Sequence, residues 1–168
     1  MESVSLVVCD VDGVLTDGGM HYHSSGSESK KFSVYDGGAP PLLEDTDIDL
    51  VILSGEKNGI VEKRCEKIGI DDVRLGVKNK SKEIKKLISF YGVKKKNVLV
   101  IVDFINDINI MRKFKSVCPS SAPEVAKNMC NEVLNVDGGN GVLWEVAKRL
   151  LKSRKLLEKK LKEYSKGK

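Results

Sequence analysis

Asp-Val-Asp-Gly-Val-Leu-Thr-Asp-Gly, residues 10–18, follows directly on the apolar run Val4–Cys9. That run predicts a buried strand, and ligands of an open α/β sheet bind outside the carboxyl ends of its strands. Asp10 and Asp12 are two aspartates at i and i+2. Such a pair can bind a hard divalent cation, and it can also provide a nucleophile with an acid beside it. An acidic turn without chemistry is the alternative, which the full nine-residue string makes the weaker interpretation.

Apolar runs and longer amphipathic segments alternate along the rest of the chain. This alternation is typical of βαβ units around a mostly parallel sheet sandwiched by helices. The predicted strands are Val4–Cys9, Leu50–Leu53, Val73–Leu75, Val98–Val102, Ser116–Cys118 and Val133–Val136, and the predicted helices cover 40–46, 57–68, 81–91, 107–114, 122–130 and 141–163. Ser121 and Glu124 have the spacing of a capping box for the fifth helix.

The segment of about residues 18–36 departs from this alternation. Met20–His23 and Glu28–Val34 flank a Ser-Ser-Gly-Ser turn, which predicts an inserted β-hairpin. An isolated hairpin is marginally stable, so we expect it to lie on a neighbouring subunit. His21 and His23 point to one side of it, where packing against that subunit is favoured over metal binding.

Length and composition predict one domain, residues 1–168, without a separate cap domain. The 168 residues are 40% hydrophobic, enough for a single core. No apolar run approaches the roughly 20 residues that span a bilayer, and the first residues lack the features of a secretory signal. With four cysteines and no CxxC pair, we expect reduced thiols and a cytoplasmic protein.

Positive charge is concentrated at one end of the chain. The net charge is +5, but residues 148–168 alone carry ten Lys and Arg and two acids, so the other 147 residues carry −3. A mildly acidic body argues against a nucleic-acid-binding protein. The basic helix of about 141–163 is expected to dock its apolar face on the body, and a tail for nucleic acid or an anionic membrane is the less favoured alternative.

Further polar residues follow later predicted strands. Ser54 and Gly55 follow Leu50–Leu53, Lys80 precedes a helix, and Asp103 follows Val98–Val102. Taken singly, each of these residues also has an interpretation without chemistry. Ser54 or Asp103 could be a helix N-cap, and Lys80 could be a surface residue among other lysines. Asp107 lies one helical turn beyond Asp103.

The string DxDGVxTDG resembles motif I of the haloacid dehalogenase superfamily of phosphotransferases, and the resemblance covers about residues 4–150. It is closest to small uncapped members that hydrolyse phosphates of 3-deoxy-2-ulosonic acids. The resemblance implies a Rossmann-like fold, Asp10 as the nucleophile and Asp12 as the general acid and base. It also implies Mg²⁺ on the Asp10 carboxylate and the Asp12 carbonyl.

The same resemblance gives roles to the later residues. Ser54 matches motif II, Lys80 the lysine of motif III, and Asp103 the metal-binding acid of motif IV, with Asp107 behind it. Motif IV departs from the common Gly-Asp-Asp pattern, because Val102 and Phe104 replace the glycine and the second acid. We expect metal binding to persist and the rate to be affected more than the reaction type.

Glu56, Arg64 and Lys67 carry the substrate prediction. On a helix opening at Gly55 they share one face, with Arg64 about 80° and Lys67 about 20° from Glu56. A carboxylate with two cations suits a polyhydroxy acid, although a solvated charged face would have the same spacing. The set resembles the branch acting on nonulosonate 9-phosphates, of the sialic acid type, since the octulosonate branch usually has Arg after the motif II glycine.

The predicted function is therefore Mg²⁺-dependent hydrolysis of a nonulosonate 9-phosphate through an aspartyl phosphate. The first alternative is the 8-phosphate of 3-deoxy-manno-octulosonate. A second alternative, of another class, is a catalytically weak tetramerisation or regulatory domain. The resemblance implies a homotetramer in which a neighbour's hairpin and tail help to close each active site, with no nucleic-acid or membrane partner.

Overall fold

A six-stranded parallel sheet forms the centre of the molecule. The structure, a computed structural model, describes residues 1–166. The sheet order is β5-β4-β1-β6-β7-β8, and every pairing is parallel. Its strands are β1 (Leu6–Cys9), β4 (Asp49–Leu53), β5 (Asp72–Arg74), β6 (Val98–Ile101), β7 (Lys115–Cys118) and β8 (Glu132–Val133). The predicted fold class is confirmed.

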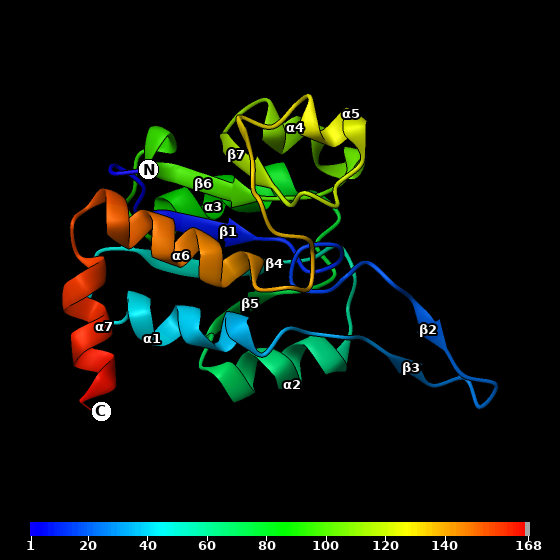
Figure 1. The fold of residues 1–168 in the computed structure, drawn as a ribbon. Coiled ribbons are helices and arrows are strands. Elements are labelled where there is room, and N and C mark those ends of the chain that lie inside the picture. Colours follow the sequence, from blue (N-terminus) through cyan, green and yellow to red (C-terminus); the bar gives the residue numbers. More distant parts are fainter. Residues whose placement is uncertain (167–168) are drawn as a thin grey trace.

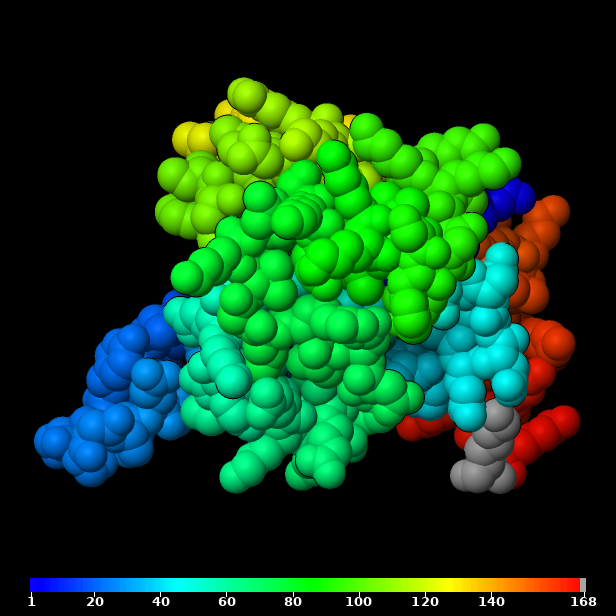
Figure 2. Space-filling view, turned by 180° about the vertical axis from the view of Figure 1, so that it is seen from behind, coloured from blue at the N-terminus to red at the C-terminus, as the bar shows by residue number. Residues whose placement is uncertain are grey.

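Helices cover both faces of this sheet (Figure 1). Along β1, Val7 and Cys9 face one hydrophobic core while Leu6 and Val8 face the other, as strand alternation requires. The first core lies under α1 (Ala39–Leu43), α2 (Gly59–Ile68) and α6 (Val142–Ser153). The second lies under α3 (Lys80–Phe90), α4 (Ile108–Met111) and α5 (Glu124–Lys127). Figure 2 shows the α3 side of the molecule.

The strand order reverses beside β1. The chain runs outward from β1 through β4 to β5, then crosses back to β6 on the other side and continues to β7 and β8. In register, Cys9 at the end of β1 lies opposite Ile52 of β4 and Ile101 of β6. The residues just after these three strands therefore meet at the position where doubly wound sheets bind ligands.

The hairpin is present but shorter than predicted. It consists of β2 (His21–Tyr22) and β3 (Glu28–Ser29), both exposed, and it projects away from the body of the molecule (Figures 1 and 2). At its base, Thr16 forms an antiparallel bridge with Phe32. His23 shares a hydrogen bond of 3.3 Å with the Ser29 hydroxyl across the hairpin.

Two local predictions are wrong. The helix predicted over 141–163 is two helices, α6 and α7 (Leu157–Ser165), because the chain turns at Lys155, which has a φ of +60°. That turn places α7 against α1. The capping box at α5 is absent, because the Ser121 hydroxyl accepts a hydrogen bond from the Gly138 amide 17 residues later (2.9 Å).

Asp36 caps α6 from a distant part of the chain. It lies in the 3₁₀ helix η1 (Tyr35–Gly38), which follows the hairpin, and its Oδ1 accepts from the Leu143 and Trp144 amides at 2.9 and 3.2 Å. Its other oxygen, Oδ2, is buried without a hydrogen-bond partner. Burial raises the pKa of Asp36 to about 6, and the two amide hydrogen bonds and Arg64 offset this only in part.

We expect Asp36→Asn to gain stability over the wild type as the pH rises from about 4 to about 6. Because the folded-state pKa is raised, ionisation of Asp36 favours the unfolded chain, and the cost is complete above pH 6. The relative gain should reach roughly 2 kcal/mol in urea unfolding at pH 7.5 compared with pH 4.5. Asp71→Asn, at an exposed aspartate, is the control. Equal pH dependence in all three proteins would contradict the prediction.

Candidate active site

The predicted chemical residues meet at the carboxyl edge of the sheet. Asp10 follows β1, Ser54 follows β4, and Asp103 follows β6 after Val102. Lys80, the first residue of α3, joins them. They line a pocket of about 350 Å³ together with Asp12, Gly13, Gly18, Gly55, Glu56, Phe104 and Asn106.

Lys80 lies between two buried carboxylates. Its Nζ is 2.7 Å from Asp10 Oδ2 and 2.7 Å from Asp107 Oδ2. Burial alone would lower the pKa of Lys80, but the two carboxylates outweigh it and the pKa is raised, so the ammonium stays charged. The alternative of a surface lysine is therefore wrong: its side chain is only 10% exposed.

Asp10 is held with one oxygen toward Lys80. Its Oδ1 accepts from the Val11 amide at 2.8 Å, which fixes the orientation of the carboxylate. Burial raises the pKa of Asp10 to about 8, since Lys80 offsets the burial only in part and Asp107 adds repulsion. The pKa of Asp103 is raised to about 6, mainly by burial and to a smaller extent by repulsion from Asp107. The site thus holds more negative charge than Lys80 neutralises.

This donor set fits a divalent cation. A Cβ built on Gly13 would lie 1.9 Å from Asp103 Oδ2, so the backbone after β1 approaches that carboxylate closely at a residue whose φ is +75°. Among the described residues no three His, Cys, Asp or Glu side chains are gathered as a metal site. Two carboxylates, Asp10 and Asp103, would need the Asp12 carbonyl and water to complete an all-oxygen shell, which Mg²⁺ prefers.

A glycine turn near the C-terminal end supports the loop after β1. The Gly139 amide donates to the Val14 carbonyl (2.9 Å), and a Cβ on Gly138 would lie 2.0 Å from the Gly13 carbonyl oxygen. Inside the loop, the Thr16 hydroxyl accepts from the Gly13 and Gly18 amides at 3.2 and 3.3 Å. The shape of the loop therefore depends on contacts that only a glycine turn can make.

Neither Ser54 nor Asp103 is a helix cap. The N-cap of α2 is Asn58, whose side chain accepts from the Ile60 amide at 2.9 Å. Ser54 Oγ instead accepts from the Glu56 amide at 3.1 Å, which leaves its hydroxyl proton free to donate into the pocket. Phe104, not Asp103, precedes the 3₁₀ helix η3 (Ile105–Asp107).

The two unusual residues of motif IV, Val102 and Phe104, lie in different surroundings. Val102 continues β6, with its amide donating to the Val117 carbonyl, and its side chain is buried in the second core. Phe104 is 45% exposed and lines the pocket where the common pattern has an acid. Asp103 keeps its place, so the departure changes the wall of the pocket more than its acidic centre.

The predicted substrate set does not come together in one chain. Because α2 begins at Gly59, Glu56 precedes the helix and the argument from a shared helical face is wrong. Glu56 does line the pocket, but Arg64 and Lys67 do not. Arg64 donates to the Ser33 carbonyl at 2.7 Å, and Lys67 is exposed in the last turn of α2.

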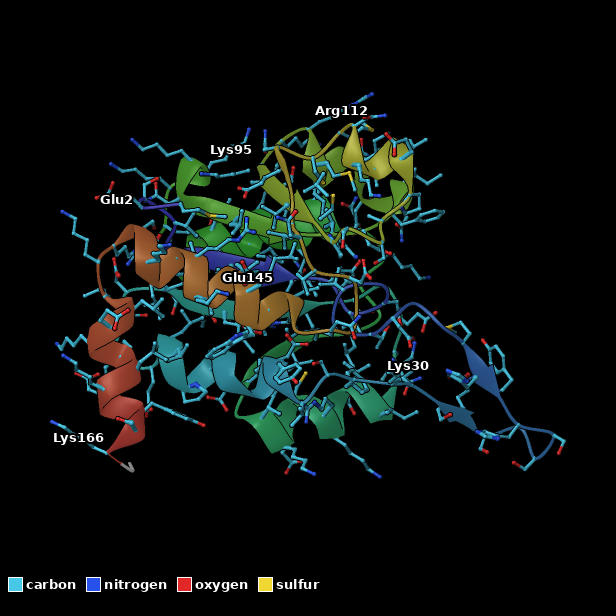
Figure 3. The ribbon with its side chains drawn as sticks, in the orientation of Figure 1. Glu2, Lys30, Lys95, Arg112, Glu145 and Lys166 are labelled. Atoms are coloured by element: carbon cyan, nitrogen blue, oxygen red, sulfur yellow. The ribbon has the colours of Figure 1, made fainter. Side chains whose placement is uncertain are left out.

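Lys30, which the sequence analysis did not assign to the site, contacts two of the residues that line the pocket. Lys30 Nζ lies 2.5 Å from Asp12 Oδ1 and 3.1 Å from Glu56 Oε2, and its side chain is 2% exposed. Figure 3 labels Lys30 where the hairpin meets the first turn of α2. Strand alternation could have shown that one of Lys30 and Lys31 faces the body, but not which one.

The fold and the pocket define a class of enzyme. A buried aspartate paired with a lysine, beside two further carboxylates at the switch point of a parallel sheet, is the arrangement of an aspartate-based phosphoryl-transfer hydrolase. A family model described as haloacid dehalogenase-like hydrolase matches residues 43–146. The chain belongs to this family and is a phosphomonoester hydrolase, a class whose cofactor is Mg²⁺.

Curated relatives match nearly the whole chain. The 3-deoxy-D-manno-octulosonate 8-phosphate phosphatase of Haemophilus influenzae is 33% identical over 155 residues, which are 92% of this chain and 86% of that protein. The Escherichia coli K12 enzyme of the same name is 32% identical over 151 residues, 89% of this chain and 80% of that protein. Both alignments are longer than the region that the family model matches.

Solved structures share the fold. The phosphatase of that name from Moraxella catarrhalis, in complex with magnesium, phosphate and KDO, aligns with a TM-score of 0.90 and 26% identity over 97% of this chain and 94% of that one. The cobalt-bound enzyme from Haemophilus influenzae aligns with a TM-score of 0.86 and 32% identity over 93% and 92%. In the part of this chain that the structure describes, no helix is both long and apolar enough to cross a membrane.

Proposed function

We propose that this protein hydrolyses the 8-phosphate of 3-deoxy-D-manno-octulosonate. The observation that supports this type of reaction is the Lys80–Asp10 pair in the pocket at the carboxyl edge of the sheet, because it places a carboxylate nucleophile beside a fixed cation. Support for the substrate comes from the curated relatives, which bear this activity in their names and match this chain over most of both lengths. This choice reverses the order of the two substrates that the sequence analysis predicted.

In the proposed mechanism Asp10 attacks the phosphorus in line and forms an aspartyl phosphate. The P–O bond to the sugar breaks, and Asp12 gives its proton to the leaving alkoxide. Asp12 then takes a proton from water, which attacks the acyl phosphate and releases inorganic phosphate. Lys80 and the Ser54 hydroxyl stabilise the negative charge of the transferring group throughout.

The Asp10 and Asp103 carboxylates and the Asp12 carbonyl would hold Mg²⁺. When bound, the cation supplies charge neutralisation for the phosphoryl oxygens and lowers the repulsion between the nucleophile and its anionic substrate. Asp107 would keep Lys80 in place through its 2.7 Å contact and would not bind the cation.

Glu56 favours a second candidate substrate, a nonulosonate 9-phosphate. An acid immediately after Gly55 resembles the branch that acts on these nine-carbon sugar acids, and this acid lies in the pocket beside Lys30. Arg64 and Lys67 would join such a site only in an assembly. We propose a homotetramer in which a neighbour's hairpin and C-terminal region close the pocket.

A matched assay separates the two substrates. Phosphate release with Mg²⁺ should be faster from the octulosonate 8-phosphate than from the nonulosonate 9-phosphate, and EDTA should stop both reactions. A clear preference for the 9-phosphate would overturn the substrate and leave the mechanism in place. Release from neither, by protein that is folded by circular dichroism, would favour an assembly domain instead.

A further inference from the structure

Lys30 is a buried charge beside the pocket, and the proposed mechanism gives it no role. The side chain comes from the returning limb of the hairpin, two residues before the Phe32 bridge. Its ammonium lies between Asp12 and Glu56, and the Met20 thioether covers it from the other hairpin limb at 3.8 Å. The sulfur and the two carboxylates explain why so long a cationic side chain is almost wholly buried.

The hairpin base is fixed to the body on both sides of Lys30. On one side, the Asn58 side chain at the start of α2 donates to Glu28 Oε2 at 3.0 Å. On the other, the antiparallel bridge between Thr16 and Phe32 ties the hairpin to the loop after β1. The backbone that carries Lys30 is therefore anchored to the loop after β1 and to α2, so its ammonium has a defined position.

Asp12 needs such a fixed partner. Its side chain is 32% exposed, and the charges around the pocket are mostly negative: Asp10, Asp103, Asp107 and Glu56. Without a cation, Asp12 would turn away from these acids toward solvent. Lys30 is its only ion-pair partner among the described residues, and the pair is short, which is typical of a charge-assisted hydrogen bond.

We propose that Lys30 is a positioning residue, which holds the Asp12 side chain through Oδ1 in the orientation that this residue needs to give a proton to the leaving group and later to take one from water, and which ties it to Glu56. This inference rests on the proposed role of Asp12. Through Asp12, Lys30 links the hairpin to the proton transfers of the reaction. Lys80, in contrast, stabilises the transferring phosphoryl group. Lys30 acts through Asp12 and takes no proton from the substrate itself.

The test is the dependence of kcat/KM on the leaving group. A primary alkoxide must receive a proton as it leaves, but p-nitrophenolate is stable without one. For Lys30→Met we expect kcat/KM to fall roughly 10- to 100-fold for n-propyl phosphate and for the octulosonate 8-phosphate, and less than about threefold for p-nitrophenyl phosphate. Lys30→Arg should recover most of the loss.

Two controls separate positioning from other effects. Lys31→Met removes the neighbouring lysine, which is 63% exposed and contacts Asp17 instead, and should leave all three rates within about twofold. The double variant Lys30→Met/Asp12→Asn should be no slower than Asp12→Asn alone, because a positioning residue has no effect once its target is gone.

Several outcomes would overturn the inference. An equal loss of kcat/KM for all three esters would show a general structural effect. A loss confined to the octulosonate phosphate would show that Lys30 binds the sugar acid. If the wild type cleaves the two reporter esters but no sugar acid phosphate, the proposed substrate fails, while the comparison of n-propyl with p-nitrophenyl phosphate still decides the role of Lys30.

Discussion

Replacing Asp10 with Asn should abolish turnover, lowering kcat by at least about 10⁴-fold on any phosphate ester. The amide is nearly the same size as the carboxylate, but it cannot form the aspartyl phosphate. Single-turnover quench with labelled substrate should show an acid-stable acyl phosphate in the wild type and none in the variant. Residual activity within 100-fold of the wild type would contradict the assignment of the nucleophile.

The same substitution should make the metal-free protein more stable at neutral pH. Asp10 is buried beside Asp107, and its pKa is raised to about 8, so holding it ionised costs folding free energy. The cost grows as the pH rises from about 4 toward 8, and Asp10→Asn removes it. Urea unfolding in EDTA would measure the gain, and it also provides the proof of folding that the loss of activity requires.

Replacing Lys80 with Met should have the largest combined effect on rate and stability. The variant leaves Asp10 and Asp107 without the cation that lies 2.7 Å from each. Removal of one partner from a buried ionic cluster costs about 3–5 kcal/mol. We expect the rate to fall at least about 10³-fold, because the transferring phosphoryl group loses its fixed positive charge.

A second substitution separates the two losses. In Lys80→Met/Asp107→Asn one unpaired carboxylate becomes neutral, so thermal unfolding should recover most of the lost stability while the rate stays low. Added Mg²⁺ should stabilise Lys80→Met more than the wild type if the ion replaces part of the missing charge. A double variant that regains activity would show that Lys80 acts only on folding.

The acidic centre of the site could be predicted from the sequence because of the way parallel sheets are built. Asp10, Ser54 and Asp103 each come directly after an apolar run, and parallel strands bring such positions to one edge. Lys80 could be predicted only by resemblance, since its surroundings in the sequence are those of a surface lysine. Its burial depends on Asp107, which lies 27 residues later.

Other features depend on contacts that sequence patterns do not encode. The apolar spacing continues across the turn at Lys155, so periodicity alone could not divide α6 from α7. The substrate prediction assumed a helix from Gly55, but Asn58 starts it at Gly59 and separates Glu56 from Arg64. Lys30 reaches Asp12 and Glu56 because the hairpin is anchored to the body, and no local sequence pattern shows that anchoring.

The glycine turn that supports the loop after β1 affects the order in which the enzyme matures. Gly138 and Gly139 hold residues 13–17 in shape. Asp36 can accept its two hydrogen bonds only once Leu143 and Trp144 have been made. A nascent chain therefore carries Asp10, the proposed nucleophile, long before the support for that loop has left the ribosome. Catalytic competence should appear only after residues 138–144 have been made, so a chain that stalls before them would be inactive.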